Sequence, residues 1–183
     1  KQKQAGAETS LIPIARDRLE SLKVVFKLSN GADLSITKGG ASEGDHDLVA
    51  QAADEFGMQQ SFYKVSMRPG KPLMAGKIGN IAMVSLPGNP VSAMVCGEVF
   101  VVPLIKKMLG LPPKPRSRLS GPLAIGLPAN GPREHYMRGK IITGQIHVDT
   151  RQDSALLTVL NASNILVVHP ANAPAKAKGT LIE

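Results

Sequence analysis

The chain has 183 residues, of which 43% are hydrophobic and 20% are charged, a composition that excludes a disordered protein and leaves room for one or two compact domains. Its net charge of +8 favours an anionic partner, while only 3% aromatic residues and scattered lysines and arginines argue against a nucleic-acid-binding surface. There is no apolar run long enough to cross a bilayer and no signal-peptide core at the start, so we expect a cytoplasmic protein without a membrane partner.

The first third of the chain predicts strands that alternate with helices. Thr9–Ile14 has the composition of a short strand, and Asp17 is a candidate N-cap for a helix that ends at Asn30-Gly31. Asp33–Thr37 predicts a second strand, which leads into a glycine-rich loop and then into a helix that ends at Gly57.

The middle of the chain predicts three more strands. Ser61–Met67 alternates between an apolar and a mixed face, which is typical of a strand. Pro72–Ile78 and Ile81–Leu86 flank the turn residues Gly79-Asn80 and predict a hairpin.

A long apolar helix is predicted from about Val91 to Leu109. Asn89 is its candidate N-cap, and Pro103 is expected to kink or divide it. The single cysteine, Cys96, lies in this helix, so we expect a small buried side chain and no internal disulfide.

The sequence changes character after residue 110. The proline-rich segment at 111–116 predicts a linker, and Arg151–Asn161 predicts a helical turn. The other predicted elements are short β-type segments at Ser117–Ile125, Tyr136–Ile142, Gln145–Asp149 and Ile165–Val168. We therefore predict an α/β domain over residues 1–110 and a small β-rich domain over residues 111–183.

The loop ITKGGASEGDHD at Ile36–Asp47 fits three interpretations: an anion site, a metal site or an ordinary turn. Its position between a strand and a helix favours an anion, although its spacing matches neither common nucleotide-binding fingerprint. Asp45, His46 and Asp47 lack further histidine or cysteine ligands at zinc spacing, whereas Mg²⁺ needs only one or two carboxylates.

A second loop, LPGNPVS at Leu86–Ser92, also lies between a strand and a helix. Two such loops at the carboxyl ends of neighbouring strands would form the ligand crevice typical of open α/β sheets. Lys64, Arg68 and Lys71 lie between the two loops in the sequence and could bind phosphate there, or could simply be solvated.

Together these pieces resemble the molybdopterin molybdenumtransferase family of the MoeA type, whose animal relative is gephyrin. The matching motifs follow one another in order over nearly the whole chain: GGASEGDHD at Gly39–Asp47, FYKVSMRPGKP at Phe62–Pro72, LPGNPVSA at Leu86–Ala93, PANGPREHYMRG at Pro128–Gly139 and RQDSALLTVLNASNILVV at Arg151–Val168.

The resemblance implies a three-layer α/β/α molybdopterin-binding domain followed by a small β-barrel domain. It also implies an enzyme that inserts molybdenum from molybdate into adenylylated molybdopterin, with release of AMP, and that uses Mg²⁺ and forms a homodimer. The alternative is a non-catalytic, gephyrin-like scaffold or ligand-binding module.

By match to the family motifs, the expected catalytic residues are Asp47, Asp17 and Lys64, and the expected metal ligands are Asp47 and Asp45. The expected substrate-binding residues are Gly39, Gly40, Ser42, Gly44, Arg68, Lys71, Pro87, Gly88, Asn89, Pro90, Ser92, Arg133 and Ser154. Among these, the resemblance implies that Arg133 and Ser154 reach the oxyanion from the second domain.

Two features depart from the family pattern. The S/T-G-D-E segment that usually opens the molybdopterin-binding domain is not found here, so we expect the chain to be a portion of a longer protein. Within the first loop, Lys38 and Glu43 replace a hydroxyl residue and a small apolar residue, and Glu43 would repel a nearby phosphate by about 1 kcal/mol in water.

Overall fold

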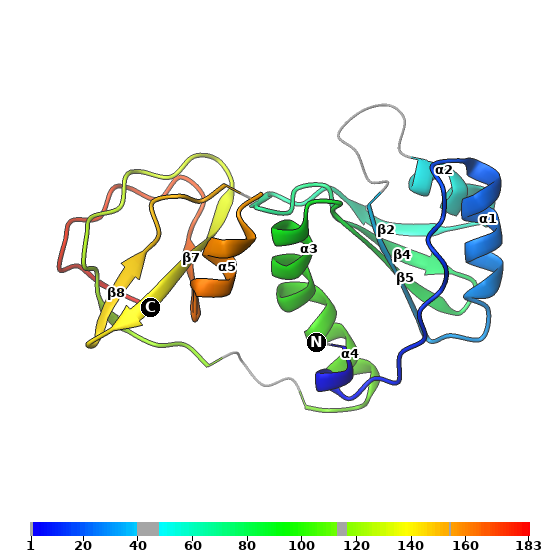
Figure 1. Ribbon diagram of the computed structural model, residues 1–183, viewed down its shortest axis with the longest axis horizontal. Coiled ribbons are helices and arrows are strands. Elements are labelled where there is room, and N and C mark those ends of the chain that lie inside the picture. Colours follow the sequence, from blue (N-terminus) through cyan, green and yellow to red (C-terminus); the bar gives the residue numbers. More distant parts are fainter. Residues whose placement is uncertain (1, 40–47, 113–116, 154) are drawn as a thin grey trace. The chain divides into compact units, whose positions relative to one another are not determined.

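The computed structural model describes residues 2–39, 48–112, 117–153 and 155–183 (Figure 1). The chain forms two compact units. The first unit contains Lys1–Val65 and Gly70–Pro113, and the second contains Ser66–Pro69 and Lys114–Glu183. The short segment Ser66–Pro69 therefore belongs with the C-terminal part of the chain, which the sequence does not predict.

A four-stranded sheet forms the centre of the first unit. Strand β1 runs parallel to β5, whereas β5, β4 and β2 are successively antiparallel. The order across the sheet is β1 (Leu34–Lys38), β5 (Ile81–Leu86), β4 (Met74–Ile78) and β2 (Gln59–Tyr63). The predicted hairpin is confirmed, with Gly79 at a positive φ of 57° in its turn.

Two amphipathic helices, α1 (Leu19–Leu28) and α2 (Leu48–Glu55), cover one face of this sheet (Figure 1). Their apolar side chains recur at helical spacing and pack against two methionines of the hairpin strands. The buried cluster contains Leu22, Phe26, Val49, Ala52, Ala53, Met74 and Met83. Its burial fixes the helices on the sheet and thereby fixes the strand ends that carry the predicted site.

A broken helix covers the opposite face. Its parts are α3 (Pro90–Cys96), a π-helical segment η2 (Gly97–Val101) and α4 (Val102–Met108). The π segment lies just before Pro103, so this residue without an N–H falls in the first turn of α4. The predicted division at Pro103 is confirmed, and Figure 1 shows the sheet between two helical layers, as the three-layer α/β/α prediction requires.

Strand β7 (Glu134–Ile142) is the centre of the second unit. It pairs antiparallel with β8 (Gln145–Val148) and β9 (Ile165–His169), and parallel with β3 (Met67–Arg68). The remaining elements are α5 (Leu157–Ala162) and the strand pair β6 (Gly121–Pro122) with β10 (Leu181–Ile182). The core contains Leu123, Leu127, Met137, Ile146, Val148, Val167 and Ile182.

The β-rich character of this unit agrees with the prediction, but its described strands form no closed barrel. The sheet around β7 and the pair β6–β10 are separate ladders. An isolated bridge between Leu123 and Ile146 reaches β8 from outside the named strands, and single bridges of this kind do not continue a ladder around a barrel.

The predicted strand at Thr9–Ile14 is wrong. This segment pairs with no strand in the described part of the chain, and Leu11 and Ile14 are 100% and 97% exposed. Pro13 removes one of the backbone donors that a ladder would need. A 3₁₀ turn, η1 (Lys3–Ala5), precedes the segment.

Two further predictions require correction. Asp17 does not cap α1, because the N-cap is Arg18 and has no side-chain capping bond. The strand predicted at Ser61–Met67 ends at Tyr63, because Lys64 has a φ of +66° that breaks the extended backbone. Among the described residues, no helix is both long and apolar enough to span a membrane.

Candidate functional site

The two glycine loops leave the same end of neighbouring parallel strands. The register of β1 and β5 ends at Lys38 opposite Leu86, and the Gly39 amide donates to the Leu86 carbonyl at 3.1 Å. Gly39 has a φ of +87°, and a Cβ added at Gly88 would lie 3.4 Å from the Gly39 Cα. The predicted adjacency of the two strand ends that lead into the loops is thus confirmed, and the backbones of Gly39 and Gly88 meet where a larger side chain at either position would separate them.

Asn89 caps helix α3, as the sequence predicts. Its Oδ1 accepts hydrogen bonds from the Val91 amide at 3.1 Å and from the Ser92 amide at 3.3 Å, while Pro90 occupies the first turn. Two of the amides that could have bound an anion are therefore already used. In this loop, the exposed backbone of Gly88 is therefore better placed to contact a ligand than the N-terminus of α3 is.

Two hydroxyl groups that the sequence analysis missed lie beneath these loops. Thr37 on β1 and Ser85 on β5 are partners in the parallel register, one position before the strands end. Both side-chain oxygens are buried, and neither has a hydrogen-bond partner. The sequence signal that could have found this site is the serine within the otherwise apolar stretch IAMVSL of β5. Its hydroxyl makes the buried end of the sheet polar.

Lys64 and Lys71 lie on two segments of the first unit that are joined by backbone hydrogen bonds. The Lys64 amide donates to the Leu73 carbonyl at 2.9 Å, and the Val65 amide donates to the Lys71 carbonyl at 3.0 Å. The exposed Lys64 ammonium lies 4.8 Å from the centroid of the Tyr63 ring. This cation stays in contact with solvent and is accessible to an anionic ligand.

Arg68 does not lie with these lysines in the first unit. It belongs to β3 of the second unit, where it is the register partner of His135. Arg68 and Arg133 are both exposed, and the charges of both act on His135. The structure therefore brings Arg68 together with Arg133, which the sequence assigned to a different domain.

His135 lies buried within this basic cluster. Burial, and then the charges of Arg68 and Arg138, lower its pKa from 6.5 to about 4. Its Nε2 atom is buried without a hydrogen-bond partner. At neutral pH the cluster therefore carries its positive charge on arginines, and the histidine stays neutral.

Several predicted site residues lie outside the described residues, namely Gly40, Ser42, Gly44, Asp45, Asp47 and Ser154, together with Glu43. Asp17 is described and exposed, but no strand precedes it, so the reason for expecting it at the crevice is lost. Among described residues, no group of three or more His, Cys, Asp or Glu side chains could hold a metal ion.

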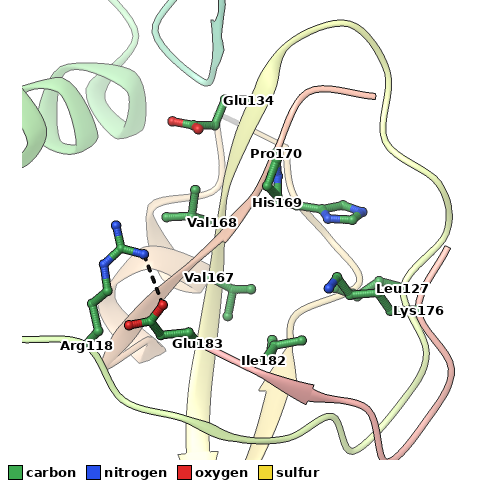
Figure 2. Close-up of a pocket in the computed structure, with 10 residues that line it drawn as sticks. All are labelled: Arg118, Leu127, Glu134, Val167, Val168, His169, Pro170, Lys176, Ile182 and Glu183. Atoms are coloured by element: carbon green, nitrogen blue, oxygen red, sulfur yellow. Dashed lines mark hydrogen bonds and ion pairs between the residues drawn. The ribbon is translucent and has the colours of Figure 1, made fainter. Parts of the chain in front are cut away.

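A separate cavity of about 280 Å³ lies in the second unit (Figure 2). An ion pair of 3.4 Å between Arg118 and Glu183 lies at its wall, and Lys176 and Glu134 add one further charge of each sign. His169 also lines it, and its Nε2 lies 3.1 Å from the Pro128 carbonyl oxygen. The lining charges balance, so the cavity favours neither anions nor cations, and its lining includes no predicted site residue.

Two family models match the chain. Residues 1–107 match the probable molybdopterin binding domain, and residues 120–183 match the MoeA C-terminal region, domain IV. Among curated relatives, a molybdopterin molybdenumtransferase of Synechococcus elongatus is 34% identical over 97% of this chain and 45% of its own length. A gephyrin of Dictyostelium discoideum is 36% identical over 55% of this chain and 16% of its own length.

The fold has solved counterparts. The crystal structure of a molybdopterin biosynthesis MoeA protein from Pyrococcus horikosii superposes with a TM-score of 0.76 and 25% identity, covering 91% of this chain and 40% of that one. This chain spans less than half the length of the curated relatives that it matches. With one family model over more than half of its residues and a second over most of the remainder, the chain belongs to the MoeA/gephyrin family of molybdopterin molybdenumtransferases.

Proposed function

We propose that this chain carries the molybdopterin-binding part of an enzyme that inserts molybdenum from molybdate into adenylylated molybdopterin, with release of AMP. The observation that carries the proposal is the apposition of Gly39 and Gly88 at the carboxyl ends of β1 and β5. Ligands of open α/β sheets bind at such strand ends, and the absence of side chains there lets a phosphate or a pterin edge approach the backbone. Residues 1–110 would form the binding domain and residues 111–183 the second domain.

The charges of the site fit the substrates. Adenylylated molybdopterin carries a phosphoanhydride, and molybdate is an oxyanion, so both require cations for binding. In our proposal Lys64 and Lys71 neutralise the phosphoanhydride, and Arg68 and Arg133 neutralise the oxyanion. The residues of each pair would act on their own ligand by positioning and by charge neutralisation.

Magnesium belongs to the same proposal, with Asp47 and Asp45 as its protein ligands. The carboxylates of both residues suit a hard cation that keeps most of its coordination for water and substrate oxygens. When bound, the ion would neutralise charge on the phosphoanhydride. Both aspartates lie outside the described residues.

Calorimetric titration of the chain with adenylylated molybdopterin tests the binding proposal. We expect saturable binding that is lost when Gly88 is changed to valine, because the branched side chain would project against the Gly39 backbone. The variant Ala82→Val, near the opposite end of the strand β5 that leads into the Gly88 loop, is the matched control and should bind normally. Binding that is absent, or that survives in Gly88→Val, contradicts the proposal.

A non-catalytic scaffold is the second candidate. Leu11 and Ile14 expose apolar side chains on an unpaired extended segment, which is the kind of surface that assemblies cover, and a gephyrin is among the relatives. Release of AMP on addition of molybdate separates the two functions, because a scaffold binds without turnover. The proposed homodimer is tested by sedimentation equilibrium, in which Leu11→Ser with Ile14→Ser should lower the association constant if this segment takes part.

A further inference from the structure

Three strands of the first unit end at the same edge of the sheet. Strand β1 is parallel to β5, and β2 is also parallel to β5 because both are antiparallel to β4. Gly39 follows the end of β1, and Lys64 follows the end of β2. Lys64 therefore lies at the same edge of the sheet as the contact between Gly39 and Gly88.

Tyr63, the last residue of β2, belongs to a row of side chains that crosses this edge. It is the register partner of Met74, which in turn is the partner of Ser85. Ser85 pairs with Thr37 on β1. Register partners share a face of the sheet, so the half-buried Tyr63 ring lies on the face that α1 and α2 cover, and it packs against their apolar cluster. Neighbouring strands are about 4.8 Å apart, so the row is roughly 14 Å long, a distance that an elongated ligand can span.

The backbone of Lys64 brings its side chain back toward Tyr63. In an extended strand, two successive side chains point to opposite faces of the sheet. The φ of +66° at Lys64 ends the extended backbone, and the ammonium lies 4.8 Å from the centroid of the Tyr63 ring. The Lys64 amide donates to the Leu73 carbonyl at 2.9 Å and holds this conformation. Glycine would adopt it without strain, so a lysine here indicates that the side chain serves a purpose.

The ring restricts the position of the ammonium without neutralising it. A lysine ammonium is carried on a flexible four-carbon stem, and the negative face of an aromatic ring attracts it. The ring of Tyr63 is itself fixed, because it packs against the apolar cluster of the first unit. A cation–π contact uses none of the three N–H donors of an ammonium, so these donors stay available to phosphate oxygens.

We propose that Tyr63 is a positioning residue that holds the Lys64 ammonium at the shared strand ends, where its N–H groups donate to the phosphoanhydride of the ligand. A carboxylate in the same place would neutralise the cation, whereas the ring leaves its charge for the ligand. The inference rests on the proposed function and adds to it the residue that determines where the binding cation lies.

The first test examines the contact in the 183-residue chain without ligand. The ring current of Tyr63 should shift the NMR signal of the Lys64 ε-methylene protons upfield, and Lys64→Gln identifies this signal. Tyr63→Phe should keep the shift, and Tyr63→Leu should remove it. Phe62→Leu is the matched control and should keep the shift, because Phe62 lies on the same strand but contacts the Phe100 ring. A Lys64 signal at the position of an ordinary exposed lysine overturns the inference.

The second test is a double-mutant cycle, measured by calorimetric titration with adenylylated molybdopterin. We expect Tyr63→Leu to raise the Kd about threefold, as the loss of an exposed cation–π contact does, while Tyr63→Phe and Phe62→Leu should bind as the wild type does. In a Lys64→Gln background, Tyr63→Leu should have no further effect. A purely structural role of Tyr63 would instead weaken binding equally in both backgrounds.

The outcomes of this cycle separate the inference from the proposed function. Equal Kd values for the wild type and Tyr63→Leu, or equal losses of affinity in both backgrounds, overturn the inference and leave the proposed function intact. Absence of binding by the wild type overturns the proposed function, and the inference with it. Tyr63→Met, which also removes the ring, takes the place of Tyr63→Leu if the leucine variant fails to fold.

Discussion

The Gly39 and Gly88 backbones meet at the ends of two parallel strands, with 3.4 Å between the Gly39 Cα and the position of a Cβ on Gly88. The contact joins residues 49 positions apart because the register of β1 and β5 brings Lys38 opposite Leu86 immediately before both loops. The two glycines therefore lie side by side at the end of the sheet, and changes in either one should affect the same ligand.

We expect Gly39→Ala to weaken binding of adenylylated molybdopterin and to lower the free energy of unfolding. The φ of +87° is unfavourable for alanine by about 1 kcal/mol, although the added Cβ has room, 3.9 Å from Gly88. Gly31→Ala is the matched control, because its φ of +85° brings similar strain with no atom within 4 Å of the new Cβ. Urea unfolding should show equal losses, and calorimetry should show weakened binding only for Gly39→Ala. Equal ligand affinity in the two variants would contradict the placement of the site.

We expect Lys64 to lower the stability of the fold and to increase the affinity for the ligand. Its φ of +66° is strained, so Lys64→Gly should raise the free energy of unfolding by about 1 kcal/mol while it removes the cation. Lys64→Gln keeps the strain and removes only the charge. Both variants should bind the adenylate about tenfold more weakly, in line with the loss of a charge-assisted contact. If Lys64→Gly were more stable yet bound normally, Lys64 would have no role in the site.

The cap of α3 is predicted to depend on the side-chain oxygen of Asn89. Asn89→Ala loses the acceptor for the Val91 and Ser92 amides and should lower the free energy of unfolding by about 1 kcal/mol. Asn89→Asp keeps the acceptor and should retain stability. Asn80→Ala, in the turn of the β4–β5 hairpin, is the control that should change little. Chemical denaturation of the four proteins measures these free energies of unfolding. An unchanged value for Asn89→Ala would show that the cap contributes nothing to stability.

His135 should make stability depend on pH. Its pKa of about 4 in the folded chain lies below 6.5, so between these values the unfolded chain binds the additional proton. The free energy of unfolding should therefore decrease as the pH falls from about 6.5 to 4, by at most about 1.4 kcal/mol per pH unit for one proton. His135→Gln should remove most of this slope in urea unfolding at stepped pH, whereas His147→Gln on β8 should retain it. An unchanged slope in His135→Gln would assign the effect to other groups.

Local signals in the sequence predict the local structure well. The hairpin around Gly79, the cap at Asn89 and the break near Pro103 each depend on a few adjacent residues whose backbone preferences are strong. The failure at Thr9–Ile14 has the opposite cause, because a strand needs a partner and composition does not supply one.

Burial of Arg138 could not be predicted from the pattern of β7. Alternation along the strand places this residue on the same face as Tyr136 and Lys140, and the polar groups of those residues indicate a solvent-facing side. Its backbone bonds to the Gln152 side chain and its guanidinium donates to the Asp153 carbonyl, and no periodicity in the sequence predicts these contacts. The grouping of Arg68 with Arg133 could not be predicted for a similar reason. It depends on contacts between distant parts of the chain, such as the hydrogen bond from the Ser66 hydroxyl to the Pro132 carbonyl, 66 positions away.

The assignment of Ser66–Pro69 to the second unit has a consequence for dissecting the protein. The chain passes between the units after Val65 and after Pro69, and again in the linker beyond Gly110, so the units are tied by three covalent connections. Truncation at residue 110 would leave β3 without β7, exposing unpaired backbone groups at Met67 and Arg68. A faithful separation of the two units would instead need Ser66–Pro69 to be replaced by a short turn, with the excised strand grafted onto the C-terminal piece.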